Sequence, residues 1–100
     1  MQKQLRGTVL IVDDEEGMRS LLEALLESLE LAYLTASTAR AAVELLAKNK
    51  DHVTACLLDM NLDDRPGELV YDELMKISPN LAVFPMSGIH GDEIKARLGN

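Results

Sequence analysis

Three aspartates stand where apolar segments of the sequence end, and they are the residues best suited to chemistry. Asp13 and Asp14 follow the apolar run at residues 8–12, and Asp59 closes a second run that begins at residue 53. Carboxylates placed directly after buried strands repel one another unless a cation offsets their charge. Mg²⁺ takes oxygen ligands of this kind. The sequence therefore predicts a Mg²⁺ site formed by Asp13, Asp14 and Asp59.

Asp59 is also suited to accept a phosphoryl group. An aspartate can form an acyl phosphate, and a divalent cation held by the acidic pair stabilises the charge on the phosphoryl oxygens. Ser87 follows another apolar run, residues 81–86, and can supply a hydroxyl to those oxygens. The alternative for Asp13 and Asp14 is a solvated helix N-terminus, where the helix dipole favours acids. Their combination with Asp59 and Ser87 at strand ends favours the site.

Alternating strand and helix patterns place these residues. A helix is predicted after the first run, because apolar residues recur at helical spacing there with glutamates on the other face. Its apolar stripe comprises Met18, Leu21, Leu22, Leu25, Leu26 and Leu29. Residues 32–36 predict a short strand, and Ser37 or Thr38 is the expected N-cap of a helix over residues 39–48.

The second half of the chain repeats this alternation. A strand over residues 53–59 and a turn over residues 61–67 lead into a helix. A strand at residues 81–86 and a short helix at residues 92–98 follow. Such alternation predicts an α/β fold, a doubly wound parallel sheet, with ligands bound beyond the carboxyl ends of its strands. If the first and third strands are neighbours, the three aspartates converge.

Composition limits the class of protein. One hundred residues predict a single domain, residues 1–100, and the scarcity of aromatic side chains predicts an aliphatic core. A net charge of −7 argues against nucleic-acid binding, which needs clustered cations. Since the sequence shows no membrane span or signal peptide, a cytoplasmic location is expected. Cys56 has no cysteine partner and is expected to be a small buried residue.

Three separated blocks resemble a response regulator receiver domain of two-component signalling. They are residues 9–15, Asp59 with Gly67 downstream, and residues 86–88. The resemblance extends over residues 8–100 and implies a flavodoxin-like sheet with strand order 2-1-3-4. It also implies a cytoplasmic phosphoprotein whose phosphoryl donor is a histidine kinase or a phosphotransfer protein.

The resemblance assigns a role to each matching residue. Asp13 and Asp14 correspond to the metal-binding acidic pair and Asp59 to the phosphoacceptor. Asn61 corresponds to the residue that lends its backbone carbonyl to Mg²⁺, and Ser87 to the switch hydroxyl. The domain implied is not an enzyme in the usual sense but a phosphoacceptor that assists its own phosphorylation and dephosphorylation.

The sequence also departs from the family pattern. Receiver domains continue into a fifth strand, which carries a lysine, and a fifth helix, whereas this chain ends at Asn100. We therefore expect a C-terminally truncated receiver without strand 5 and helix 5: an excised fragment, a naturally shortened domain, or one completed by a partner. The strand at residues 81–86 would then be an open edge of the sheet. This predicts a homodimer or swapped dimer through that fourth strand and the fourth predicted helix, residues 92–98.

Two function classes follow. The first is a receiver that accepts a phosphoryl group on Asp59 in a Mg²⁺-dependent reaction. The second is a pseudo-receiver, a protein-interaction module in which phosphorylation is lost or uncoupled. An aspartate-nucleophile phosphatase is disfavoured, because no second aspartate stands two residues after Asp59.

Overall fold

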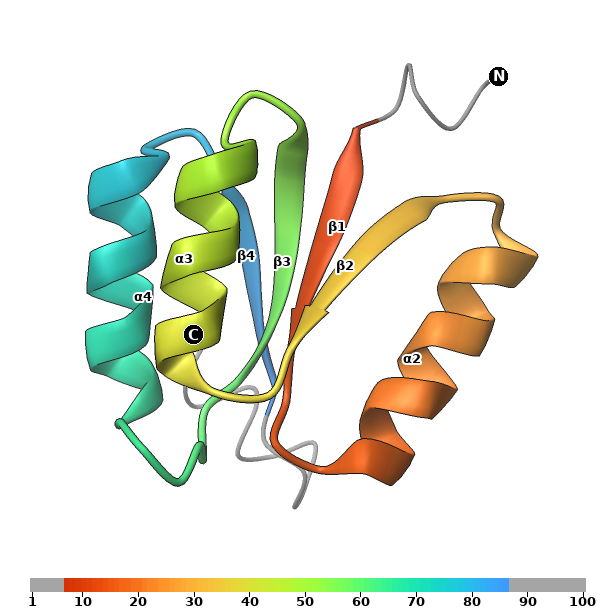
Figure 1. The fold of residues 1–100 in the computed structure, drawn as a ribbon, viewed down its shortest axis with the longest axis horizontal. Helices are drawn as coiled ribbons and strands as arrows, with labels where there is room; N and C mark the ends of the chain where they lie inside the picture. The colour runs from red at the N-terminus through yellow and green to blue at the C-terminus, as the bar shows by residue number, and fades with distance from the viewer. Residues whose placement is uncertain (1–6, 87–100) are drawn as a thin grey trace, which may run out of the picture.

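The computed structural model describes residues 7–86 and shows a four-stranded parallel sheet. The strands are β1 (Thr8–Val12), β2 (Ala32–Ala36), β3 (Val53–Asp59) and β4 (Ala82–Met86). They lie in the order β2-β1-β3-β4, and every neighbouring pair is parallel (Figure 1). The predicted α/β class and the predicted 2-1-3-4 order are confirmed.

Helices cover both faces of this sheet. They are α2 (Glu16–Ser28), α3 (Ala39–Asn49) and α4 (Gly67–Ile77). Figure 1 shows α3 and α4 together on one face and α2 on the other. The helix predicted at residues 92–98 and the hydroxyl of Ser87 lie outside the described residues.

The main core lies between the sheet and the pair α3–α4, and it is aliphatic as expected. Its fully buried members are Leu10, Val12, Ala39, Ala42, Leu46, Cys56, Leu58, Val70 and Leu74. Burial raises the pKa of the Cys56 thiol to about 12, which keeps it protonated and confirms its role as a small core residue.

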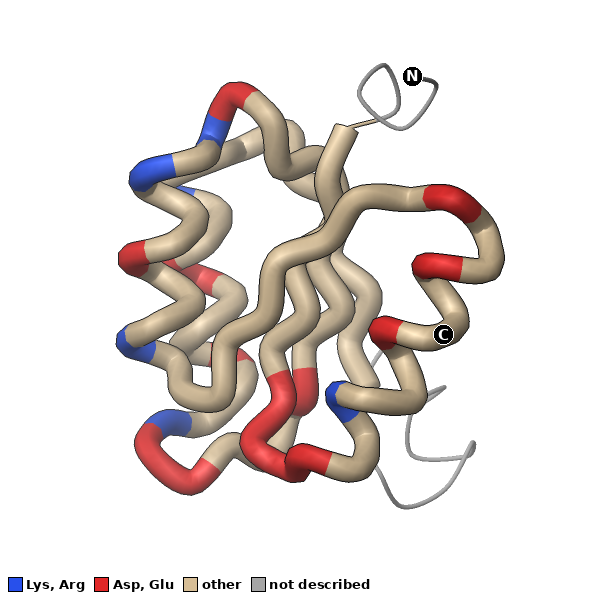
Figure 2. Tube along the Cα trace, turned by 45° about the vertical axis from the view of Figure 1, so that its right-hand side comes forward, with Lys and Arg blue, Asp and Glu red and all other residues tan. Residues whose placement is uncertain are grey.

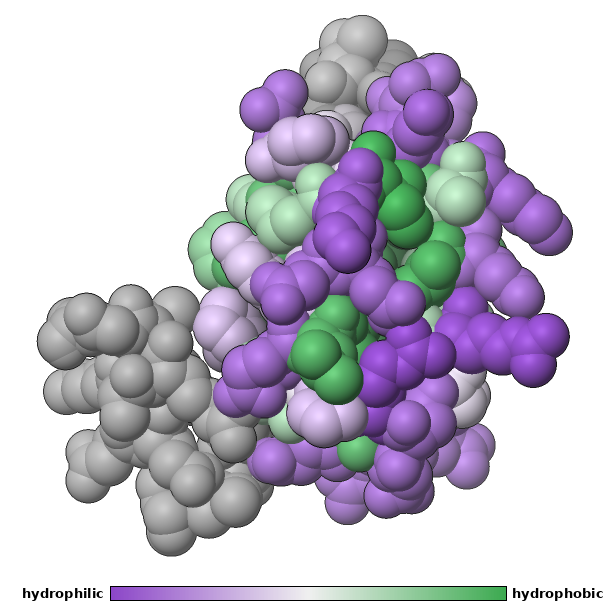
Figure 3. Space-filling view, turned by 90° about the vertical axis from the view of Figure 1, so that its left-hand side faces the viewer, coloured by the Kyte–Doolittle hydropathy of each residue, from purple (hydrophilic) through white to green (hydrophobic). Residues whose placement is uncertain are grey.

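The outer surface of α3 and α4 is mainly hydrophilic. Figure 3 shows this side of the molecule, where hydrophilic residues separate the apolar patches from one another. The apolar stripe of α4 is turned inward at Val70 and Leu74, whereas Leu69 is half exposed. Within residues 7–86, no helix combines the length and the apolar character that crossing a membrane requires.

The helix predicted from the first apolar stripe is present as α2, but only part of the stripe is buried. Leu26 is the buried residue of α2, whereas Leu21, Leu25 and Leu29 are 63%, 52% and 54% exposed. At about 100° per residue these three leucines form one row beside the buried Leu26 rather than on its line. Helix α2 packs on β1 and β2, and the exposure of the leucine row shows that the described elements leave it largely uncovered.

Pro85 lies inside β4, where it is opposite Leu58 of β3. Proline lacks the N–H that a strand uses for pairing, so it is tolerated mainly on edge strands. Among the described residues, β4 has one strand neighbour and forms an edge of the sheet. The edge position of β4 therefore accounts for a proline within a strand.

Candidate metal centre

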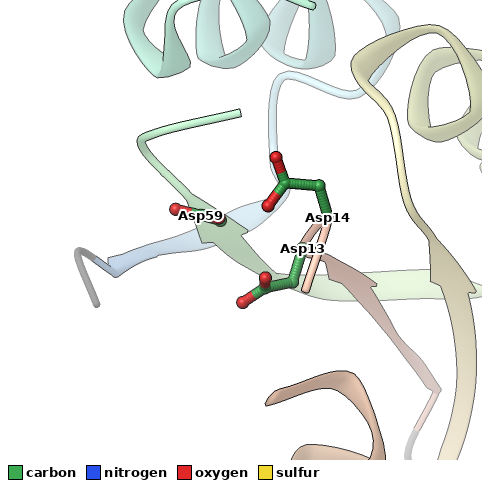
Figure 4. A group of neighbouring side chains, drawn as sticks. All are labelled: Asp13, Asp14 and Asp59. Carbon is green, nitrogen blue, oxygen red and sulfur yellow. The ribbon is translucent and has the colours of Figure 1, made fainter. Parts of the chain in front are cut away.

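The three predicted aspartates converge at the carboxyl ends of two neighbouring strands. Asp13 and Asp14 directly follow β1, and Asp59 is the last residue of β3 (Figure 4). Val12 pairs in register with Leu58, and the residues that directly follow this pair are Asp13 and Asp59. One carboxylate oxygen from each side chain lies within 4.8 Å of the other two. Figure 2 shows further acidic residues in the loops along this edge of the sheet.

Backbone N–H groups orient all three carboxylates. Asp13 Oδ1 accepts from the N–H of Glu15 at 2.9 Å, and Asp59 Oδ1 accepts from the N–H of Asn61 at 2.9 Å. Asp14 Oδ2 accepts from the N–H of Asp63, 49 residues away, at 3.2 Å. In each aspartate, one carboxylate oxygen accepts a backbone N–H, and this bond fixes the orientation of the side chain.

Burial and mutual repulsion make the ionised cluster costly without a cation. Burial raises the pKa of Asp13, and the negative charges of Asp14 and Glu15 add to this effect. Burial likewise raises the pKa of Asp59, with further increases from the charges of Asp13 and Asp14. The N–H bonds to Glu15 and Asn61 oppose these shifts without cancelling them. A divalent cation would remove the repulsion, and oxygen donors of this kind fit Mg²⁺.

An arginine side chain that the sequence pattern did not reveal supports this site. Arg19, in the first turns of α2, donates from Nη1 to the backbone carbonyl of Asp13 at 2.8 Å. This bond closes the turn between β1 and α2 from the helix side. The sequence does not predict this bond, because arginines are common on solvent-exposed helix surfaces and only the folded turn brings Arg19 to the Asp13 carbonyl.

Asp64 has a structural contact that the sequence did not predict. The sequence favoured a solvated turn for Asp63 and Asp64, with a role in shaping the entrance to the site as the alternative, and both residues are exposed. The Asp64 carboxylate nevertheless accepts hydrogen bonds from the N–H groups of Ala39 and Arg40 at the start of α3. These bonds lower the pKa of Asp64, the Ala39 bond most strongly. Because the partners are 24 and 25 residues apart in the chain, no local pattern could reveal them.

Asn61 and Ser87 are the other residues that the sequence predicts for this site. Asn61 is exposed, with its N–H bound to Asp59 Oδ1, and its carbonyl as a metal ligand stays a prediction. Ser87 lies outside the described residues. The residue before it, Met86, pairs in register with Asp59, so β4 ends beside Asp59.

Comparison with known proteins gives one family. The model of the response regulator receiver domain matches residues 9–98. The autoinducer 1 sensor kinase/phosphatase LuxN of Vibrio campbellii is 33% identical over 85 residues, which are 85% of this chain and 10% of that protein. The transcriptional regulatory protein GlrR of Escherichia coli K12 is 28% identical over 83 residues, 83% of this chain and 18% of that protein. The chain thus spans less than a fifth of either relative.

Solved structures agree with the fold. A response regulator receiver domain protein from Clostridium thermocellum superposes with a TM-score of 0.81 at 28% identity, covering 92% of this chain and 72% of that one. CheY in the CheX–CheY–BeF3–Mg²⁺ complex of Borrelia burgdorferi also gives 0.81, at 22% identity, covering 92% and 70%. At 22% identity, the similarity to the Borrelia burgdorferi structure is evidence for the fold and not for a shared function.

Proposed function

The chain belongs to the response regulator receiver domain family, and on that premise we propose that Asp59 accepts a phosphoryl group in a Mg²⁺-dependent reaction. The donor is a phosphohistidine of a histidine kinase or of a phosphotransfer protein, and the reaction takes place in the cytoplasm. The observation that carries the proposal is the convergence of three carboxylates within 4.8 Å at the ends of β1 and β3.

Each residue of the cluster has a part in the proposed reaction. Asp13 and Asp14 would hold the cation, together with Asp59 and the backbone carbonyl of Asn61. When bound, Mg²⁺ would supply charge neutralisation for the phosphoryl oxygens. The Ser87 hydroxyl, which follows the β4 residue paired with Asp59, donates to one of those oxygens.

The transfer itself exchanges one bond to phosphorus for another. An Asp59 carboxylate oxygen forms a bond to phosphorus while the bond from phosphorus to the donor imidazole nitrogen breaks, and that nitrogen keeps the electron pair. The Asn61 N–H, bound to Oδ1 of Asp59, fixes the carboxylate and leaves Oδ2 as the proposed nucleophile. Orientation of the nucleophile is a principal way in which a protein assists phosphoryl transfer.

Phosphorylation by a small donor tests this proposal. The protein is incubated with acetyl phosphate and Mg²⁺, and the intact mass is measured. We expect one added phosphoryl group, which is lost in hydroxylamine as an acyl phosphate and does not form when EDTA removes the metal. Asp59→Asn should remain unmodified. Asp51→Asn, which removes an exposed acid before β3, at the opposite end of the sheet, should be modified like the native protein.

Two results would contradict the phosphoacceptor function. One is the absence of any adduct on the folded native protein, with beryllofluoride also failing to bind in the presence of Mg²⁺. The other is equal modification of Asp59→Asn. The first result would favour the alternative function, a pseudo-receiver that acts as a protein-interaction module.

We also propose that two copies associate through β4. Among the described residues β4 is an edge strand, and Phe84 in it is 53% exposed. Edge strands that present unpaired backbone groups are able to pair with a second chain. Light scattering should show a dimer fraction that grows with concentration and decreases in Phe84→Lys. A single monomeric species at high concentration would oppose this association.

A further inference from the structure

The first turn of α3 is completed by a residue from a distant loop. The first four N–H groups of a helix have no partner within it. In α3 the N–H of Ala41 donates to the hydroxyl of Thr38 at 3.0 Å, and the regular bonds of the helix begin with the Ala42 N–H on the Thr38 carbonyl. Two further N–H groups of the first turn, those of Ala39 and Arg40, donate to the Asp64 carboxylate.

Asp64 belongs to the loop that joins β3 to α4, and this loop also contacts the acidic cluster. The N–H of Asn61 donates to Asp59 Oδ1, and the N–H of Asp63 donates to Asp14 Oδ2 at 3.2 Å. The residue next to Asp63 is Asp64, whose carboxylate is fixed on α3 at 3.0 and 3.1 Å from the Ala39 nitrogen. One short segment therefore joins two cluster carboxylates to the start of a helix.

We propose that Asp64 is a positioning residue for the metal centre. By anchoring the loop to α3, it keeps the Asp63 N–H on Asp14 and the Asn61 backbone beside Asp59. Asp64 acts through these groups and does not itself contact the cation. This inference rests on the proposed function in one respect, namely that the three aspartates bind Mg²⁺.

The other anchors of the loop do not replace this contact. The loop ends are held where Gly67 donates to the Met60 carbonyl and Met60 donates to the Met86 carbonyl. Arg65 forms an ion pair with Glu73 on α4, which restrains the loop from the α4 side. Residues 61–64 lie between these points, and Asp64 is the side chain that ties them to α3. The contact that Asp64 would preserve is the bond from the Asp63 N–H to Asp14, and loss of a hydrogen bond to a metal ligand typically weakens metal binding about 10–100-fold.

The test measures Mg²⁺ affinity by titration calorimetry and amide exchange by NMR in Asp64→Ala. We expect affinity to decrease about tenfold. The Asp63 amide should exchange faster even without metal, because its bond to Asp14 depends on the loop position. Two matched variants separate this role from helix capping and from loop charge. Thr38→Ala removes the other cap of α3, and Glu73→Gln removes the ion pair to Arg65; both should bind Mg²⁺ within about twofold of the native protein.

Each outcome decides the inference. If Asp64→Ala exposes only the Ala39 and Arg40 amides, with Asp63 protection and Mg²⁺ affinity unchanged, Asp64 is merely a helix cap and the inference is overturned. If Asp64→Ala does not fold, Asp64→Asn, which keeps one acceptor oxygen, carries the same measurements. If the native protein binds no Mg²⁺, the proposed function fails, and the metal-free exchange of the Asp63 amide alone decides the positioning role.

Discussion

Asp13→Asn is expected to abolish Mg²⁺ binding and, at the same time, to raise the thermal stability of the metal-free protein. Asp13 is 5% exposed, and burial is the main reason why its pKa lies above the ordinary value of 3.8. Asparagine has nearly the same shape and keeps the oxygen that accepts the Glu15 N–H. It carries no charge to be desolvated and none to repel Asp14 and Asp59.

The pH dependence of this effect has a definite sign. A carboxyl whose pKa is raised in the folded state contributes stability that is fully present below the unfolded pKa. That contribution is lost as pH rises through the folded pKa. The metal-free native protein and Asp13→Asn should therefore unfold at similar temperatures below about pH 3.8, the ordinary pKa of Asp13. The variant should become the more stable of the two as pH rises.

Mg²⁺ should reverse the order of stability at neutral pH. A ligand that binds only the folded state stabilises it by about 2.7 kcal/mol at a free concentration 100 times Kd. The native protein should gain this stability, whereas Asp13→Asn should gain none. Thermal unfolding with and without MgCl₂ measures the crossing, and calorimetry should show affinity reduced by more than about 100-fold.

Asp51→Asn also removes one negative charge but lies before β3, away from the cluster, so it should follow the native protein in both conditions. If metal-free Asp13→Asn unfolds at a lower temperature than the native protein at neutral pH, the buried Asp13 carboxylate does not destabilise the fold. Retained Mg²⁺ affinity would exclude Asp13 as a ligand.

Gly67→Ala is expected to cause the second large effect, a loss of stability. Gly67 is the buried first residue of α4, and its N–H donates to the Met60 carbonyl at 3.3 Å. A Cβ at this position would lie 2.6 Å from the Met60 Cα and 2.7 Å from its Sδ. The sulfur end of the side chain can rotate, but the Cα belongs to the backbone between Asp59 and Asn61. The clash therefore has to move the backbone that directly follows Asp59.

Overpacking of this kind costs about 1–3 kcal/mol. For a domain of this size each kcal/mol lowers the midpoint of thermal unfolding by about 4–8 °C. Mg²⁺ affinity should also decrease, because Met60 adjoins both Asp59 and Asn61. Thermal unfolding followed by circular dichroism measures the first effect, and titration calorimetry the second.

Gly17→Ala is the matched control for this substitution. Gly17 lies in α2, and a Cβ there would meet nothing within 4 Å. Alanine should stabilise the protein by up to about 1 kcal/mol through its higher helix propensity. If Gly67→Ala is as stable as Gly17→Ala, the close approach of Gly67 to Met60 does not constrain the fold.

The sequence was informative where the signal is local. Strands alternate or run apolar over a few residues and helices repeat every 3.6 residues, so the bounds of β2 and β3 and the start of α3 could be predicted from neighbouring residues alone. Thr38 was one of two candidate caps and is the one that caps α3. A carboxylate at the end of a buried strand is costly, which is why residue type and position together indicated the cation site.

The sequence by itself therefore determined the element order, the sheet class and the three aspartates at strand ends. Tertiary structure decided how these residues are held. The register of β1 against β3 brings the oxygens within 4.8 Å, and burial raises the pKa of Asp13 and of Asp59. Asp64 reaches the start of α3 across 25 residues, and the leucine row of α2 stays exposed although the helix packs on β1 and β2. Local patterns fix which side chains a strand or helix offers, whereas distances and burial depend on packing between segments far apart in the chain.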